Sequence, residues 1–133
     1  MPTLSEFAVT VGLRHYEADN RRETYFRFET VRQFRSFRYE VEIDEKLDAG
    51  NNALDFSIKG VVAAAGLMSS TGSAYREITY PELLGEFDVR ISGAKESGAF
   101  RFRGDENGIT LLDVDAGEFV QVNVADEIEM IRA

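Results

Sequence analysis

Cysteine and tryptophan are absent from the 133-residue chain, and proline occurs only twice. Without cysteine the chain cannot form disulfides, zinc–thiolate sites, iron–sulfur clusters or a thiol nucleophile. No apolar run approaches the roughly 20 residues of a membrane helix, since the longest candidate spans only Val61 to Met68. No basic segment followed by an apolar one opens the sequence, so we expect a cytoplasmic protein without a secretory signal or membrane contact.

Basic side chains are also scarce, because 15 Lys and Arg stand against 24 Asp and Glu for a net charge of −9. This acidic balance disfavours nucleic-acid binding, which depends on clustered cations. The chain length, with 44% hydrophobic and 29% charged residues, is typical of one globular domain. We therefore predict a single domain over residues 1–133 that folds without a metal ion or other cofactor.

Alternation of apolar and polar residues with period two dominates the sequence and predicts β-strands. The clearest strand covers 37–44, where four apolar side chains alternate with charged ones. The segment 61–68 is apolar on both faces and predicts a fully buried strand. Similar patterns predict further strands over 7–13, 22–31, 54–59, 73–80, 87–92, 100–103, 109–112 and 120–124.

Polar and glycine-containing segments separate these strands and predict turns. They cover 16–22, 45–52, 69–72, 93–98 and 104–108. A change in the apolar phase places a bulge or a turn at Arg35–Ser36. Residues 81–85 favour a single helical turn, because Pro81 suits its start and Gly85 its end. The segment 126–133 is compatible with a strand or a short helix.

Eight to ten short strands at this spacing predict an all-β fold. An antiparallel β-sandwich is the favoured architecture, and a closed β-barrel is the alternative. The inward positions of the strands predict the core. We expect burial of Phe37, Tyr39, Val41, Ile43, Leu54, Phe56, Ile58, Phe87, Val89, Ile91, Phe100, Phe102, Val120, Val122 and Val124.

Two acidic groups are candidates for chemistry. Asp113, Asp115 and Glu118 offer oxygen ligands for a divalent cation, although the remaining positions of a calcium loop are missing and an acidic turn explains them better. Glu40 and Glu42 share one strand face, where we expect them to be solvated opposite arginines rather than catalytic. We therefore assign no catalytic, cofactor-binding or metal-binding residue.

The basic and titratable side chains near the N-terminus have ordinary explanations. His15 is the only histidine, and we expect it to be exposed in a hairpin because no nucleophile accompanies it. An arginine-rich segment would suit an anionic ligand, but interleaved glutamates favour cross-strand salt bridges instead. Its members are Arg21, Arg22, Arg27, Arg32, Arg35 and Arg38.

No phosphate-binding loop, serine-hydrolase elbow or zinc-protease motif occurs in the sequence. We therefore expect a non-catalytic binding or protein-interaction module with an unidentified protein or small-molecule partner. One alternative is a β-barrel carrier of a small apolar ligand, with a cavity beneath Ala63–Gly66. The other is an enzyme that uses carboxylates or a divalent metal ion.

The strand over 22–31 carries aromatic side chains on both faces, at Tyr25 and Phe26. Both faces should therefore be covered. Because the chain has only three lysines to protect strand edges, we expect this strand to pair with its copy in a homodimer. The alternative is a monomer whose edge is kept soluble by Arg27, Glu29 and Arg32.

Overall fold

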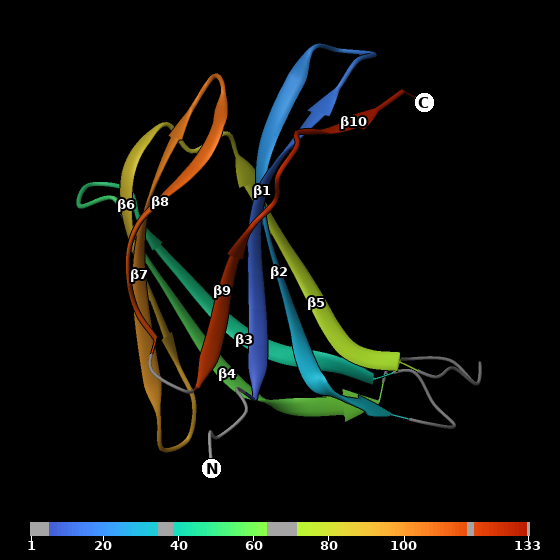
Figure 1. The fold of residues 1–133 in the computed structure, drawn as a ribbon, viewed down its shortest axis with the longest axis vertical. Helices are drawn as coiled ribbons and strands as arrows, with labels where there is room; N and C mark the ends of the chain where they lie inside the picture. Colours follow the sequence, from blue (N-terminus) through green and yellow to red (C-terminus); the bar gives the residue numbers. More distant parts are fainter. Residues whose placement is uncertain (1–5, 35–38, 64–71, 117–118, 133) are drawn as a thin grey trace.

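The computed structural model describes residues 6–34, 39–63, 72–116 and 119–132, which form ten strands and no helix (Figure 1). The all-β prediction and the predicted number of strands are confirmed. Within the described residues, no helix is long and apolar enough to cross a membrane. The strands are β1 (Phe7–Tyr16), β2 (Arg21–Phe34), β3 (Tyr39–Asp48), β4 (Ala53–Ala63), β5 (Gly72–Pro81), β6 (Gly85–Ser92), β7 (Ser97–Asp105), β8 (Gly108–Asp115), β9 (Val120–Val124) and β10 (Glu129–Ile131).

All ten strands belong to one sheet that curls into a nearly closed, barrel-like wall (Figure 1). The strand order is β10-β1-β2-β5-β3-β4-β6-β7-β8, and β9 also pairs with β1. The sheet has an edge at β8, which has no hydrogen-bonded neighbour beyond β7 among the described strands.

The sheet is mixed, whereas the sequence predicted antiparallel pairing throughout. The pairs β1–β9, β1–β10, β3–β5 and β4–β6 are parallel. The strands β6, β7 and β8 form the predicted meander, but β9 leaves it and lies along β1. These parallel pairs join strands that are distant in the sequence, so no hairpin signal could have revealed them.

Three local predictions are wrong. Residues 45–48, predicted as loop, extend β3 and leave a short turn that ends at Asn52 with a φ of 49°. Residues 81–85 form no helical turn, because the Leu83 N–H donates to Thr24 Oγ1 at 2.9 Å and Leu83 is buried. The described part of the segment 61–68 is not fully buried, since Val62 is 42% exposed, and residues 64–68 lie outside the described residues.

Breaks in strand register occur at other places than the sequence suggested. The predicted break at Arg35–Ser36 lies outside the described residues. The pairing of β3 with β4 shifts between Glu42 and Ile43, opposite Gly60, whose φ of 152° bends β4 without ending it. The pairing of β2 with β5 also shifts, between Glu29 and Gln33.

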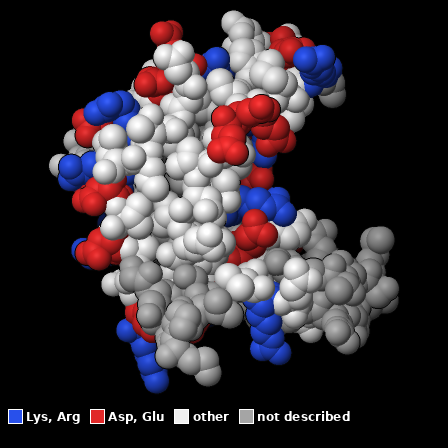
Figure 2. Space-filling model, viewed as in Figure 1, with Lys and Arg blue, Asp and Glu red and all other residues white. Residues whose placement is uncertain are grey.

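Apolar side chains face the interior of the curled sheet, and charged side chains face outward. In β6, for example, Phe87, Val89 and Ile91 are buried, while Asp88 and Arg90 between them are exposed. Figure 2 shows charges of both signs alternating along the side of the molecule where β6 and β7 lie in Figure 1. Period-two alternation therefore sets which residues line the outer surface.

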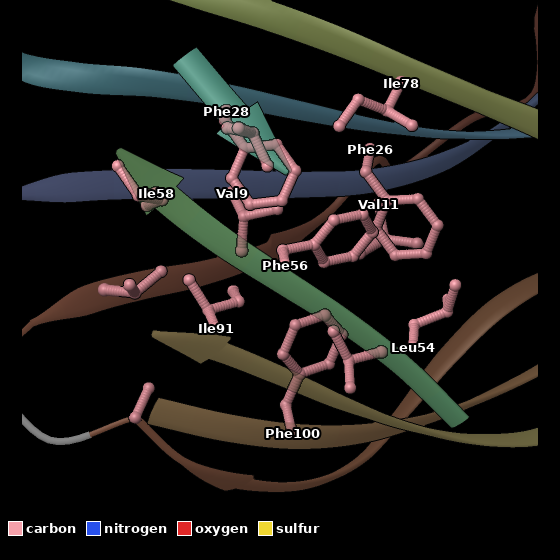
Figure 3. Close-up of a cluster of buried hydrophobic side chains, with 14 of the residues drawn as sticks. Val9, Val11, Phe26, Phe28, Leu54, Phe56, Ile58, Ile78, Ile91 and Phe100 are labelled. Atoms are coloured by element: carbon pink, nitrogen blue, oxygen red, sulfur yellow. The ribbon is translucent and has the colours of Figure 1, made fainter. Parts of the chain in front are cut away.

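Aromatic rings fill the centre of the core, where Phe56 from β4 meets Phe26 and Phe28 from β2 (Figure 3). Their ring centroids lie 5.1 and 4.9 Å from that of Phe56. The predicted core is largely confirmed, with three members only partly buried (Tyr39, Val122 and Val124) and Phe37 outside the described residues. Fully confirmed are Val41, Ile43, Leu54, Phe56, Ile58, Phe87, Val89, Ile91, Phe100, Phe102 and Val120.

Candidate functional site

A groove of about 470 Å³ crosses the outer face of the sheet over β4, β6, β7 and β8. Leu54, Val89 and Phe100 border it through their main chains and turn their side chains to the core. Each of the four strands contributes two outward-facing residues to its lining. These are Ala53 and Asp55, Asp88 and Arg90, Ala99 and Arg101, and Asp113 and Asp115.

Strand register arranges these eight residues in two rows that run across the strands. The first row, in order from β4 to β8, is Ala53, Asp88, Arg101 and Asp113. The second row, in the same order, is Asp55, Arg90, Ala99 and Asp115. Directly opposed residues on neighbouring strands lie about 5 Å apart, so each row is a fixed line of side chains.

Small side chains create the hollow. Ala53 ends the first row, and Ala99 lies between Arg90 and Asp115 in the second row. A methyl group leaves open the space that a long side chain would cover on a sheet surface. Arg90, directly opposite Ala99, and Arg101, two residues along β7 from it, border the hollow.

An ion pair joins two of the charges in the first row. Arg101 Nε donates to Asp88 Oδ1 at 2.8 Å, and this hydrogen bond raises the pKa of Arg101. Asp113, on the other side of Arg101, adds a further favourable charge. Arg101 is thus held between two carboxylates.

The charges in the second row form no close ion pair among the described residues. Asp55, Arg90 and Asp115 form no ion pair and no side-chain hydrogen bond with any residue in the described part of the chain. Although Asp55 opposes Arg90 in the register, Ala99 separates Arg90 from Asp115. Within the groove this row presents one guanidinium between two carboxylates, and outside the groove lining Lys46 of β3 is directly opposite Asp55.

The groove contains two of the three residues that the sequence singled out as cation ligands. Asp113 and Asp115 lie on β8, and Glu118 is outside the described residues. Across 6–34, 39–63, 72–116 and 119–132, no three acidic or histidine side chains are close enough together to hold a metal ion. The other acidic pair is separate from the groove, on β3, where Glu42 is exposed and Glu40 is half-buried beside Tyr75.

Sequence reasoning missed Asp55, Asp88, Arg90 and Arg101 as members of one site. The signal available in the sequence was that the outward positions of two successive strands carry charges of both signs. Asp88 and Arg90 lie on β6, and Arg101 lies on β7. The decisive information, the parallel pairing of β4 with β6, has no local sequence signature.

Ion pairs account for the described arginines of the arginine-rich segment. Arg21 contacts Glu23 at 3.3 Å and Arg27 contacts Glu29 at 3.5 Å along β2 itself, and Arg27 also reaches Glu77 of β5 at 3.9 Å, a cross-strand pair of the predicted kind. Arg32 also has an interaction partner. Arg35 and Arg38 lie outside the described residues.

Tyr25 is covered on its outer face by the chain itself. The Arg14 guanidinium lies 4.7 Å from the centre of the Tyr25 ring, and Nη1 of Arg14 is 2.6 Å from Oε1 of Glu77. The ring packs on Gly12, where a Cβ atom would lie 2.5 Å from the tyrosine oxygen. Burial raises the pKa of Tyr25, and the Glu77 hydrogen bond raises that of Arg14.

This cover removes the reason for pairing strand 22–31 with a copy of itself. The strand β2 is not an edge, because β1 and β5 pair with its two sides. The premise of an exposed edge at this strand is therefore wrong, and the predicted homodimer would need another surface.

His15 is half-buried, which corrects the prediction of an exposed histidine. Its Nδ1 accepts a hydrogen bond from Arg22 Nε at 3.3 Å. Arg22 also donates from Nη1 to the main-chain oxygen of Glu106 at 2.8 Å and lies 3.7 Å from Glu82. His15 thus helps to orient an arginine that joins β1 and β2 to the β7–β8 turn.

The buried hydroxyl of Tyr80 forms no hydrogen bond of good geometry among the described side chains and main chain, although Glu45 lies close enough to interact with it. Burial, followed by the charge of Glu45, raises the pKa of Tyr80.

Replacing Tyr80 by phenylalanine keeps the ring that packs against Phe26 and removes the hydroxyl group. We therefore expect the free energy of unfolding to rise by about 1 kcal/mol. Urea denaturation measures this change, and a loss of more than about 0.5 kcal/mol would mean that the hydroxyl has a partner such as Glu45.

Comparison of the chain with protein-family models, curated proteins and solved structures gives no match. The groove over β4, β6, β7 and β8 therefore has to be interpreted from its own shape and charges. Its distinguishing features are the hollow at Ala99 and the side chains of Asp55, Arg90 and Asp115, which form no close ion pair among the described residues.

Proposed function

We propose that this domain is a non-catalytic binding module whose ligand occupies the groove over β4, β6, β7 and β8. The observation that carries the proposal is a hollow of about 470 Å³ bordered by Asp55, Arg90 and Asp115, which form no close ion pair among the described residues. Ligand sites commonly have volumes of about 300–1,000 Å³ and a few polar groups that fix orientation. The groove has both properties.

The groove is also built on rigid elements. The strands β6 and β7, which contribute Arg90 and Ala99, are each hydrogen-bonded to a neighbour on both sides. Binding groups carried by such strands keep their spacing better than groups on loops. A ligand therefore meets an arrangement that is formed before it arrives.

The two alternative functions have less support. A carrier of an apolar ligand needs interior space, but Phe26 packs against Phe56 at 5.1 Å and Phe102 at 5.9 Å inside the curled sheet. Of the cavity predicted beneath Ala63–Gly66, only Ala63 is described, and it is exposed. Carboxylate catalysis generally needs one buried acid, whereas all four aspartates of the groove are exposed.

The proposal predicts where small molecules contact the domain. In ¹⁵N NMR titrations with N-acetylarginine amide, N-acetylglutamate and glycylglycine, we expect chemical-shift changes to concentrate on the residues that line the groove. Replacing Ala99 by glutamine narrows the hollow and should weaken these changes, because its longer side chain occupies the space beside Arg90.

Ser97→Gln is the matched control, since Ser97 is an exposed residue of the same strand and outside the groove lining. Its titration should resemble that of the unmodified protein. Shift changes spread evenly over the surface, or unaffected by Ala99→Gln, would overturn the proposed function.

A further inference from the structure

We infer that the groove binds an extended segment of a partner protein that carries basic, acidic and basic side chains at positions i, i+2 and i+4. The inference rests on the proposed function and adds the chemistry of the partner. It follows from the order of charges along the second row within the groove, which is acidic at Asp55, basic at Arg90 and acidic at Asp115, with Lys46 of β3 beside Asp55 outside the groove.

The spacing of the row matches that of an extended peptide. Asp55 and Asp115 are separated by three strand spacings, or about 14 Å at 4.7–4.9 Å per spacing. Four residues of extended chain cover about 13 Å, and residues i, i+2 and i+4 point to the same side. A segment lying across the strands thus places its outer side chains over Asp55 and Asp115.

The middle position of the segment meets Arg90. A side chain at i+2 lies about 7 Å along the row, between Arg90 and the hollow above Ala99. A carboxylate at this point can enter the hollow and accept hydrogen bonds from the guanidinium in a two-pronged geometry. A basic group there would instead face the charge of Arg90.

The β8 end of the groove is suited to a guanidinium. Asp113 and Asp115 lie on the same face of β8, two residues apart, so their main-chain positions are about 7 Å from each other. A single arginine at i+4 can reach Asp115 and share Asp113 with Arg101. Arg101 does not compete for Asp115, because it is hydrogen-bonded to Asp88.

The test compares three peptides of five residues with blocked ends. The expected ligand is acetyl-Arg-Ser-Glu-Ser-Arg-amide. Acetyl-Arg-Arg-Ser-Ser-Glu-amide has the same composition and net charge in another order, and acetyl-Glu-Ser-Arg-Ser-Glu-amide inverts the charges. Titrations followed by ¹⁵N NMR should give the first peptide an affinity at least about threefold higher than the reordered one, as expected when exposed ion pairs are matched.

A charge exchange identifies the pairing directly. Asp115→Lys should weaken binding of the first peptide and improve binding of acetyl-Arg-Ser-Glu-Ser-Glu-amide, each by about two- to fivefold. Glu86→Gln is the matched control, because Glu86 is an exposed acid outside the groove lining that pairs with Arg103. It should leave both affinities close to those of the unmodified protein, and its ¹⁵N spectrum verifies the fold.

Equal affinity for the expected and the reordered peptide would overturn the inference, since net charge alone would then explain binding. So would an effect of Glu86→Gln as large as that of Asp115→Lys. If the peptides gave these results but the chemical-shift changes from the small molecules still concentrated on the groove, the proposed function would stand and only the inference about the partner would fall. If the small-molecule changes also failed to concentrate on the groove, both proposals would fall.

Discussion

Replacing Phe56 by alanine is expected to lower the free energy of unfolding by about 3–5 kcal/mol. Phe56 is fully buried, and its ring lies within 5.1 Å of the ring centres of Phe26 and Phe28. Removing it leaves a cavity between β4 and β2, whose strands cannot close the gap without losing their pairing to neighbours (Figure 3). Urea denaturation at constant m-value measures the loss.

Leu84→Ala is the matched control for this substitution, because Leu84 is 61% exposed. Its removal should change stability by no more than about 0.5 kcal/mol. A loss below about 1 kcal/mol for Phe56→Ala would show that the aromatic cluster does not hold the two sides of the curled sheet together.

The substitution Gly104→Ala is expected to destabilise the domain by about 1–3 kcal/mol, or by more if the main chain cannot adjust. A Cβ atom on Gly104 would overlap the main-chain oxygen of Leu83. Leu83 cannot move away freely, because it is buried and its N–H bonds to Thr24 Oγ1. The added methyl group should therefore displace the segment between β5 and β6.

The loss of stability expected for Gly104→Ala has the opposite sign to the usual effect of replacing an exposed glycine by alanine. In most exposed positions alanine is neutral or slightly stabilising, because it restricts the unfolded chain. Gly50→Ala provides the comparison, since a Cβ there meets only Asp48 Oδ1 at an ordinary 3.6 Å. If thermal denaturation gave both variants the same midpoint, close approach of Leu83 to Gly104 would be excluded.

Local alternation was enough to predict which side chains enter the core. Val89 and Ile91 on β6 and Phe100 and Phe102 on β7 are buried as the period-two pattern required. This succeeds because a strand exposes one face to water, so sequence and burial have the same period. The polar faces of these strands could be predicted for the same reason.

Pairing between distant strands could not be predicted, and the groove depends on it. Asp55 and Arg90 become neighbours only because β4 and β6 run parallel. The hairpins of β6 with β7 and of β7 with β8 were visible in their turns, so Arg101 could have been placed opposite Asp88 from the sequence. The same limit explains why strand 22–31 was taken for an edge, since β5 reaches it from more than 40 residues away.

The position of β1 between strands from both ends of the chain has a consequence for the order of folding. One side of β1 pairs with β2 through a short turn, but its other side pairs with β9 and β10. Contacts between residues this far apart in the chain slow folding, because a long loop must close first. During synthesis at about 5–20 residues per second, the outer edge of β1 waits about 5–20 s for Val120 to emerge. A nascent chain therefore carries an unpaired strand edge at Phe7–Val11 that chaperones or other chains can reach before β9 covers it.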